Sequence, residues 1–115
     1  MTAAAIVVLC TAPLAGRDEK PGAHELASTL VAESLCACVN VVPAVRSYFR
    51  WQGVVDTADE LLLVIKTTAE AAVRLRERIV QLHPYDLPEV LELPIAGGLP
   101  GYLAWLVEAV PPRSP

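Results

Sequence analysis

Residues 59–95, DELLLVIKTTAEAAVRLRERIVQLHPYDLPEVLELPI, carry the pattern of a strand, a helix and a second strand in immediate succession. Leu61–Ile65 is a continuous apolar run closed by Lys66, which is typical of a strand buried on both faces. Residues 67–70, Thr-Thr-Ala-Glu, match a capping box, in which the first hydroxyl accepts a hydrogen bond from the backbone N–H of Glu70. This pattern predicts a helix that starts directly after the strand.

The helix predicted over about residues 68–83 has one apolar stripe. Its apolar side chains recur at three- and four-residue steps: Ala72, Leu75, Ile79 and Leu82. On the other side, Glu70 and Arg74 stand four residues apart, a spacing that favours an ion pair. Pro84 ends the helix, because the residue before a proline is pushed out of the helical region. Beyond it, the alternation over residues 90–94 predicts a short strand.

A similar unit precedes this stretch at the start of the chain. The β-branched apolar run over residues 4–11 predicts a central strand. A solvated loop over 14–22 leads to a helix expected from about residue 22 to Cys36, where apolar residues again share one face. At the other end of the chain we expect a short helix over residues 102–110 and a frayed tail over 111–115.

Residues 38–50, CVNVVPAVRSYFR, predict an unusually long strand of about 40 Å, at roughly 3.3 Å per residue. Pro43 predicts a bulge or an edge, because proline has no N–H for a central ladder. Residues 51–53 form the predicted turn, in which Gly53 supplies the positive φ that returns the chain. The order predicts an α+β fold: a ferredoxin-like βαββαβ antiparallel sheet with two helices on one face plus a short C-terminal helix.

Length and charge restrict the function. The 115 residues predict a single domain, 1–115, with a core over about 4–110. A formal net charge of −4 without a basic patch argues against a nucleic-acid partner. The N-terminus lacks a cationic segment followed by a long apolar one, so we expect a cytoplasmic protein and no membrane partner. Three cysteines, an odd number, suit a reducing compartment.

Several short motifs resemble one known family when they are taken together. In chain order they are Val8-Leu9-Cys10-Thr11-Ala12-Pro13, Leu35 to Val39, Trp51 with Gly53, Lys66-Thr67-Thr68, His83-Pro84-Tyr85 with Pro88-Glu89, and Tyr102-Leu103-Ala104-Trp105-Leu106. Each motif alone is weak, but their order and spacing over about residues 6–110 resemble the CutA divalent-cation tolerance proteins.

The resemblance implies a small cytosolic homotrimer of ferredoxin-like fold, linked to tolerance of copper and other divalent cations and without a settled enzymatic activity. It also implies copper or another divalent cation as ligand, with Cys10 and His83 at positions associated with copper and Cys38 at a further family cysteine. Three features depart from the family. Cys36 stands where alanine is usual, the loop over 16–22 is longer, and only one histidine precedes the proline.

The residues themselves leave the metal site open. Thiolate and imidazole are ligands that soft copper ions prefer. Cys10 is equally interpretable as a buried small apolar residue, and His83 as a residue that stabilises a helix C-terminus. Cys36 and Cys38 share one face if both lie in a strand, and diverge if Cys36 ends the helix, which is the interpretation we favour.

A second candidate site is a small-ligand cleft lined by Lys66, Tyr85, Glu89 and Trp105. Lys66 needs a carboxylate or a wet cleft, because a buried unpaired ammonium is costly, and Glu89 is its expected partner. The pair lines a ligand cleft or merely ties strand ends together. The alternative function is therefore a trimeric small-molecule sensor or signalling scaffold of PII-like architecture, with ligand between subunits. No enzyme motif is present, and we expect no catalytic residues.

The long hairpin predicts self-association. A strand over 38–50 is too long to be paired throughout by a small domain, so Tyr48, Phe49 and Trp51 should project from it. Isolated hairpins are marginal in water, and exposed apolar edges need a partner chain. A head-to-tail contact must close into a ring to avoid a filament. The family resemblance sets that ring at three subunits.

Overall fold

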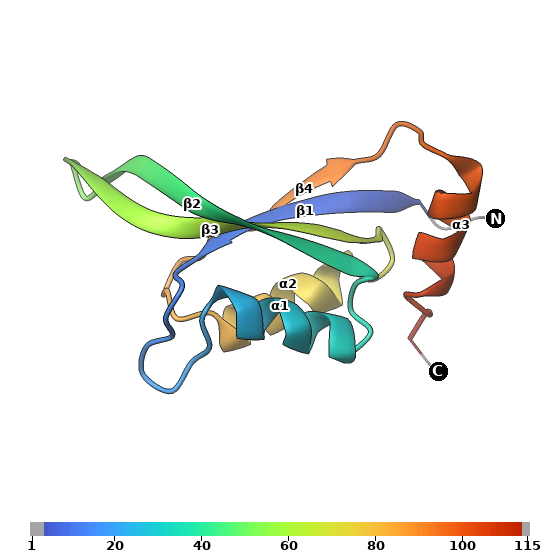
Figure 1. Ribbon diagram of the computed structural model, residues 1–115, viewed down its shortest axis with the longest axis horizontal. Helices are drawn as coiled ribbons and strands as arrows, with labels where there is room; N and C mark the ends of the chain where they lie inside the picture. The colour runs from blue at the N-terminus through green and yellow to red at the C-terminus, as the bar shows by residue number, and fades with distance from the viewer. Residues whose placement is uncertain (1–3, 114–115) are drawn as a thin grey trace.

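The computed structural model describes residues 4–113 and has the predicted order of elements. The strands are β1 (Ala5–Ala12), β2 (Cys38–Trp51), β3 (Val54–Thr68) and β4 (Leu91–Pro94), and the helices are α1 (Ala23–Ala32), α2 (Ala72–Leu82) and α3 (Pro100–Glu108). One antiparallel sheet has the order β2-β3-β1-β4. Helices α1 and α2 lie on one face of it, and α3 lies at one end (Figure 1). The predicted α+β ferredoxin-like fold is confirmed.

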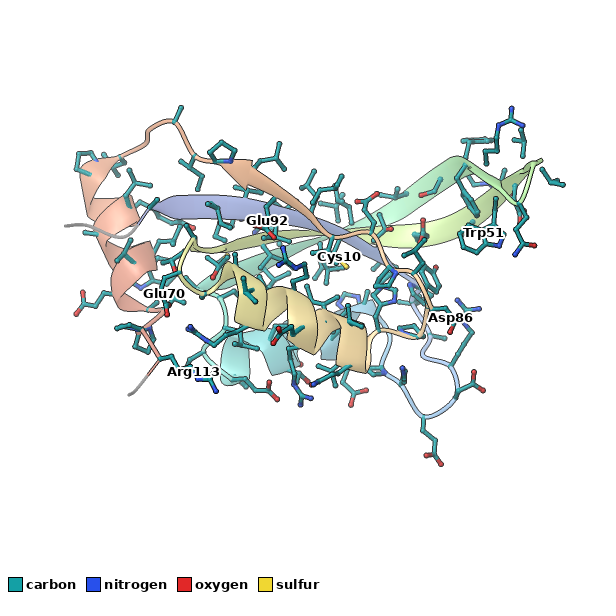
Figure 2. All side chains as sticks on the ribbon, turned by 180° about the vertical axis from the view of Figure 1, so that it is seen from behind. Cys10, Trp51, Glu70, Asp86, Glu92 and Arg113 are labelled. Atoms are coloured by element: carbon teal, nitrogen blue, oxygen red, sulfur yellow. The ribbon has the colours of Figure 1, made fainter. Side chains whose placement is uncertain are left out.

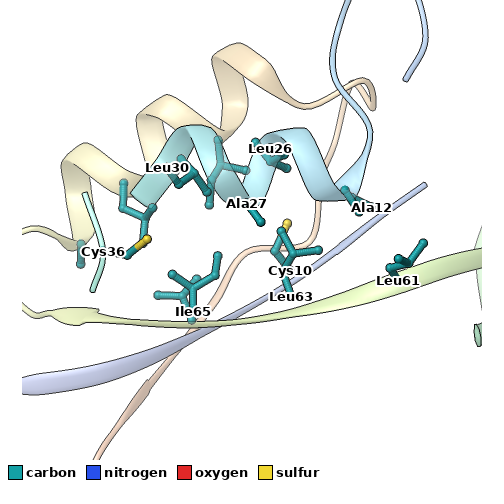
Figure 3. Close-up of a cluster of buried hydrophobic side chains, with 14 of the residues drawn as sticks. Cys10, Ala12, Leu26, Ala27, Leu30, Cys36, Leu61, Leu63 and Ile65 are labelled. Carbon is teal, nitrogen blue, oxygen red and sulfur yellow. The ribbon is translucent and has the colours of Figure 1, made fainter. Parts of the chain in front are cut away.

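The core lies between the sheet and the two helices on its covered face. Every second residue of β1 is buried there, because side chains alternate between the two faces of a strand. The same alternation in β3 buries Leu61, Leu63 and Ile65 against α1, whose Leu26 and Leu30 are fully buried (Figure 3). The second helix closes the other side with Leu75 and Ile79, as its predicted stripe required.

No helix lies over the other face of the sheet along most of its length (Figure 1). We call it the open face. The strand registers place these residues on it: Val7, Leu9, Cys38, Asn40, Val42, Leu62, Val64, Lys66, Leu91 and Leu93. Apolar side chains predominate there, and Val42, Leu91 and Leu93 are among the exposed large hydrophobic residues of the chain. A face of this composition is a strong indication of an interaction surface.

The β2–β3 hairpin projects beyond the sheet, as predicted. The last residue of β1, Ala12, pairs with Leu61, so residues 54–60 of β3 pair only with β2. Figure 2 shows this two-stranded ribbon extending away from the helices, with Trp51 near its tip. The bulge expected at Pro43 is confirmed by the register shift between Val42 and Val45.

Two local predictions about the helices were wrong. Thr67 does not cap α2, because β3 continues through Thr68 to pair with Ala5, and the helix begins at Ala72 without a side-chain cap. The Thr67 hydroxyl instead donates to the Leu35 carbonyl at 2.8 Å. Strand pairing thus overrides the local capping pattern.

Helix α1 ends at Ala32, earlier than Cys36, because Ser34 adopts a left-handed φ of 60° and the Leu35 N–H bonds the Leu30 carbonyl. The Glu70–Arg74 ion pair is confirmed at 2.6 Å.

The two ends of the chain are described only in part. The frayed tail predicted over residues 111–115 extends beyond the described residues, which end at Arg113. The backbone N–H of Arg113 lies 3.5 Å from a Glu70 carboxylate oxygen. Within residues 4–113, no helix is long and apolar enough to cross a membrane.

Candidate functional site

Cys10 lies in the core on the covered face of β1, opposite Leu63 of β3 (Figure 3). Its side chain is fully buried. Burial, followed by the negative charges of Glu89 and Glu60, raises the pKa of the Cys10 thiol to about 12. The thiolate that a metal ion requires is therefore disfavoured in this conformation.

His83 follows α2 and is also fully buried. Its Nδ1 accepts the backbone N–H of Tyr85 at 3.0 Å, and its Nε2 lies 2.7 Å from the Thr11 carbonyl oxygen. Because Nδ1 is an acceptor here, Nε2 carries the proton and donates to Thr11. The ring is thus a neutral bridge between β1 and the turn after α2. Burial lowers the pKa of His83, which outweighs the opposing effect of the Thr11 bond.

Tyr85 belongs to a polar cluster beside His83 that sequence reasoning did not identify. The Tyr85 hydroxyl donates to the Glu60 carboxylate at 2.9 Å, and the Arg17 guanidinium lies 4.8 Å from the Tyr85 ring centroid. Glu60 is only 6% exposed. Burial and the Glu60 carboxylate raise the pKa of Tyr85 to about 12, so the phenol stays protonated. The signal for Glu60 was present, since a carboxylate next to an apolar run needs a partner.

A second group of side chains lies at the opposite end of the sheet, beside α3. Its members are Cys38, Lys66, Tyr102 and Trp105. Cys38 and Lys66 are directly opposite each other on β2 and β3, and the Lys66 Nζ is 4.0 Å from the Cys38 Sγ. The Tyr102 ring lies 5.4 Å from the Trp105 ring, centroid to centroid. Burial, followed by the neighbouring Cys38 thiol, raises the pKa of Tyr102.

The four residues of the predicted cleft do not converge within one protomer. Tyr85 bonds Glu60, which is six residues from Lys66 along β3, or about 20 Å at roughly 3.3 Å per residue. The expected Lys66–Glu89 pair does not form. None of the ion pairs within residues 4–113 involves Lys66, and Glu89 lies near Cys10 at the other end of β1. The strand register places Lys66 at one end of the sheet and Glu89 near the other end, and the sequence alone does not specify this register.

The two neighbouring cysteines diverge, as we favoured. Cys36 precedes β2 and enters the core beside α1 (Figure 3). Cys38 lies on the open face, opposite Lys66. Burial raises the pKa of the Cys36 thiol to about 12. Of the three free thiols, only that of Cys38 belongs to a partly exposed residue.

In this conformation, Cys10 and His83 are a poor fit for a metal ion. Both nitrogens of His83 already have hydrogen-bond partners, and the Cys10 thiol is buried and protonated. In addition, no three His, Cys, Asp or Glu side chains of the described residues are grouped so as to hold a metal ion.

Comparison with known proteins decides the family. The profile of the family described as CutA1 divalent ion tolerance protein matches residues 6–109. The chain belongs to this family. The divalent-cation tolerance protein CutA of Thermus thermophilus is 49% identical over 102 residues, which cover 89% of this chain and 94% of the relative.

Solved structures of CutA proteins have the same fold as this chain. The divalent cation tolerance protein from Thermus thermophilus superposes with a TM-score of 0.84 at 48% identity, covering 93% of this chain and 99% of the other. The PII-like protein CutA from Nostoc, solved in apo form, superposes with a TM-score of 0.82 at 30% identity, covering 94% and 99% of the two chains. The family resemblance drawn from the short motifs is thereby confirmed.

The three free cysteines should differ in reactivity, because two thiols are buried and one is partly exposed. We expect Cys38 to react with a thiol-specific disulfide reagent in the native protein, and Cys10 and Cys36 to react only after unfolding. Native and denatured titrations of the wild-type chain and of Cys38→Ser test this. Equal native reactivity in the two proteins would contradict the assignment.

Proposed function

We propose that this chain is a homotrimeric protein that binds copper or another divalent cation in the metal tolerance of the cell. Membership of the divalent ion tolerance family supports the link to cations. The projecting ribbon and the apolar open face support the assembly, because both leave apolar surface exposed in a single chain. We keep the cytoplasm as the expected compartment, since all three cysteines are free.

One observation supports Cys38 as the proposed cation ligand: Cys38 is partly exposed, whereas Cys10 and His83 are buried. Within one protomer, Cys38 is the thiol of the described residues that a soft metal ion reaches without rearrangement. The family resemblance implies Cys10 and His83 as metal ligands. They become available to a metal ion only if the hydrogen bonds of His83 with Thr11 and Tyr85 open. The cation thus binds first at Cys38, and the Cys10–His83 pair is a second, conformationally gated contact.

Titration with Cu(I) under oxygen-free, reducing conditions tests this order. Cys38→Ala is expected to weaken binding at least tenfold, which corresponds to about 1.4 kcal/mol. The double variant Cys10→Ser, His83→Gln is expected to keep the tight Cu(I) binding, because it leaves Cys38 in place and changes only buried side chains. Cys36→Ala serves as the matched control, since it removes a buried thiol that the proposal does not use.

If Cys38→Ala binds Cu(I) as tightly as the wild-type chain while the double variant loses binding, the gated pair is the primary site. If all variants bind alike, none of these side chains holds the cation.

A second function is favoured by Lys66, whose ammonium lies on the open face without a carboxylate partner among the described residues of its own chain. We propose an anionic small molecule as the alternative ligand, held between subunits where Lys66 and Trp105 of one copy approach Tyr85 and Glu89 of another. The likeness to a PII-like CutA supports this architecture. A thermal-shift screen of metals and metabolites on one preparation separates the two functions, because a ligand that binds only the native state raises Tm.

A further inference from the structure

Tyr85 packs against His83 and is held in place by three parts of the chain. Its backbone N–H donates to His83 Nδ1 at 3.0 Å, and the two rings lie 4.6 Å apart, centroid to centroid. The Tyr85 hydroxyl donates to Glu60 of β3 at 2.9 Å, and the Arg17 guanidinium lies 4.8 Å from the Tyr85 ring centroid. Because the partner of Nδ1 is the Tyr85 backbone itself, Nδ1 becomes free only when Tyr85 moves.

The loop that carries Arg17 has a fixed shape. Arg17 and Lys20 exchange two backbone hydrogen bonds, at 3.1 and 2.9 Å. Gly16 leaves no room for a side chain, because a Cβ there would lie 2.0 Å from the Lys20 carbonyl oxygen. None of the ion pairs within residues 4–113 involves Arg17. The loop therefore presents the guanidinium to the Tyr85 ring at a small cost in conformational entropy.

We propose that Arg17 is a latch that controls the access of a cation to the Cys10–His83 pair, an inference that rests on the proposed role of this pair as a gated second contact. The guanidinium stacks on the Tyr85 ring and holds Tyr85 against His83, so that Nδ1 stays occupied by the Tyr85 N–H. Release of Arg17 favours the open conformation, in which Nδ1 is free. Arg17 is thus a positioning residue that acts through Tyr85 and does not touch the cation.

The size of the effect follows from the populations of the two conformations. A cation that binds only the open conformation has an apparent affinity reduced by the fraction of chains that are open. Loss of an exposed cation–π contact changes such an equilibrium by about two- to fivefold. Loss of Arg17 should therefore raise the open fraction and the apparent affinity of the Cys10–His83 pair by the same factor.

Amide hydrogen exchange of the full-length, metal-free chain tests the latch, since the Tyr85 N–H is the group that leaves His83. Arg17→Gln should speed exchange at Tyr85 about two- to fivefold and leave exchange at the buried Leu63 unchanged. Arg17→Lys keeps a cation for the ring and should restore slow exchange. The urea midpoint should stay the same in both variants, because Arg17 is exposed, whereas a merely structural role would lower it.

Lys20→Gln is the matched control. Lys20 is the partner of Arg17 in the loop and carries the same charge, but it makes no cation–π contact among the described residues. Exchange at Tyr85 should therefore stay at the wild-type rate in this variant. Wild-type exchange in Arg17→Gln, or an equal acceleration in Lys20→Gln, would overturn the latch.

Cu(I) titration in a Cys38→Ser background measures the Cys10–His83 pair without the exposed thiol. Adding Arg17→Gln to this background should raise the apparent Cu(I) affinity by the factor found for exchange at Tyr85. Unchanged Cu(I) affinity despite faster exchange would overturn the control of cation access by Arg17. If neither protein binds Cu(I), the pair is not a cation contact and that part of the proposed function fails, while faster exchange in Arg17→Gln still supports the hold of Arg17 on Tyr85.

Discussion

Trp51→Asp is expected to convert a trimer into smaller species. The wild-type chain should sediment near three times 12.3 kDa at micromolar concentration. Trp51 lies at the end of a two-stranded ribbon that also exposes Tyr48 and Phe49, and aromatic side chains dominate the energetics of such contacts. Placing a carboxylate there should weaken each contact by about 2–4 kcal/mol, as at other aromatic hot spots. Sedimentation of both proteins at matched concentrations measures the change.

Val73→Asp is the control for this experiment. Val73 is 49% exposed, like Trp51, but lies at the start of α2 on the helical side of the molecule. A carboxylate near a helix N-terminus is tolerated, so the trimer should persist. A clean monomer from the unmodified chain would refute both the ring and the role assigned to the ribbon.

His83→Ala is expected to lower the free energy of unfolding by about 3–5 kcal/mol, since it leaves a cavity in the core and removes the hydrogen-bond partner of two partly buried backbone groups. The imidazole is fully buried and bridges Thr11 and Tyr85. Chemical denaturation at a fixed protein concentration measures the loss, because assembly also contributes to stability. His24→Ala is the matched control. His24 is exposed on α1 and should cost less than about 0.5 kcal/mol. Equal effects of the two substitutions would contradict the bridging role.

The same burial gives stability a defined pH dependence. The pKa of His83 is lowered in the folded chain, whereas an unfolded histidine titrates near about 6.5. Below that pH the unfolded chain therefore binds a proton that the folded chain does not. Stability should fall as pH drops below about 6.5 and should be independent of His83 above it. The wild-type chain should thus lose more stability than His83→Gln between neutral and mildly acidic pH, and parallel profiles would exclude this origin.

The order of the elements follows from local sequence patterns. The helical stripe of α2, the bulge near Pro43 and the turn at Gly53 were all predicted, and the structure confirms them. The prediction that Leu61–Ile65 is buried on both faces was wrong for the single chain, because the helices cover only one face and burial alternates along β3. Each confirmed feature depends on neighbours within a few residues, through side-chain periodicity or a fixed φ angle. The family also follows from short motifs, because their order along the chain is itself sequence information.

The candidate sites depended on information that the sequence does not contain. Thr67 matches a capping pattern, yet pairing of β3 with β1 extends the strand through it. Lys66 was assigned to Glu89, yet the register places it opposite Cys38. The Tyr85–Glu60 bond joins residues that are distant in the chain, and no local period predicts it.

By itself, the sequence determined which segments are strands and helices and to which family they belong. Only the tertiary structure decided which thiol is accessible, which amine lies beside it, and that His83 is a buried bridge. The reason is physical. Secondary structure is set by interactions over a few residues, whereas burial and strand register are set when the sheet closes against its helices, and these two quantities govern the chemistry of a thiol, an amine or an imidazole.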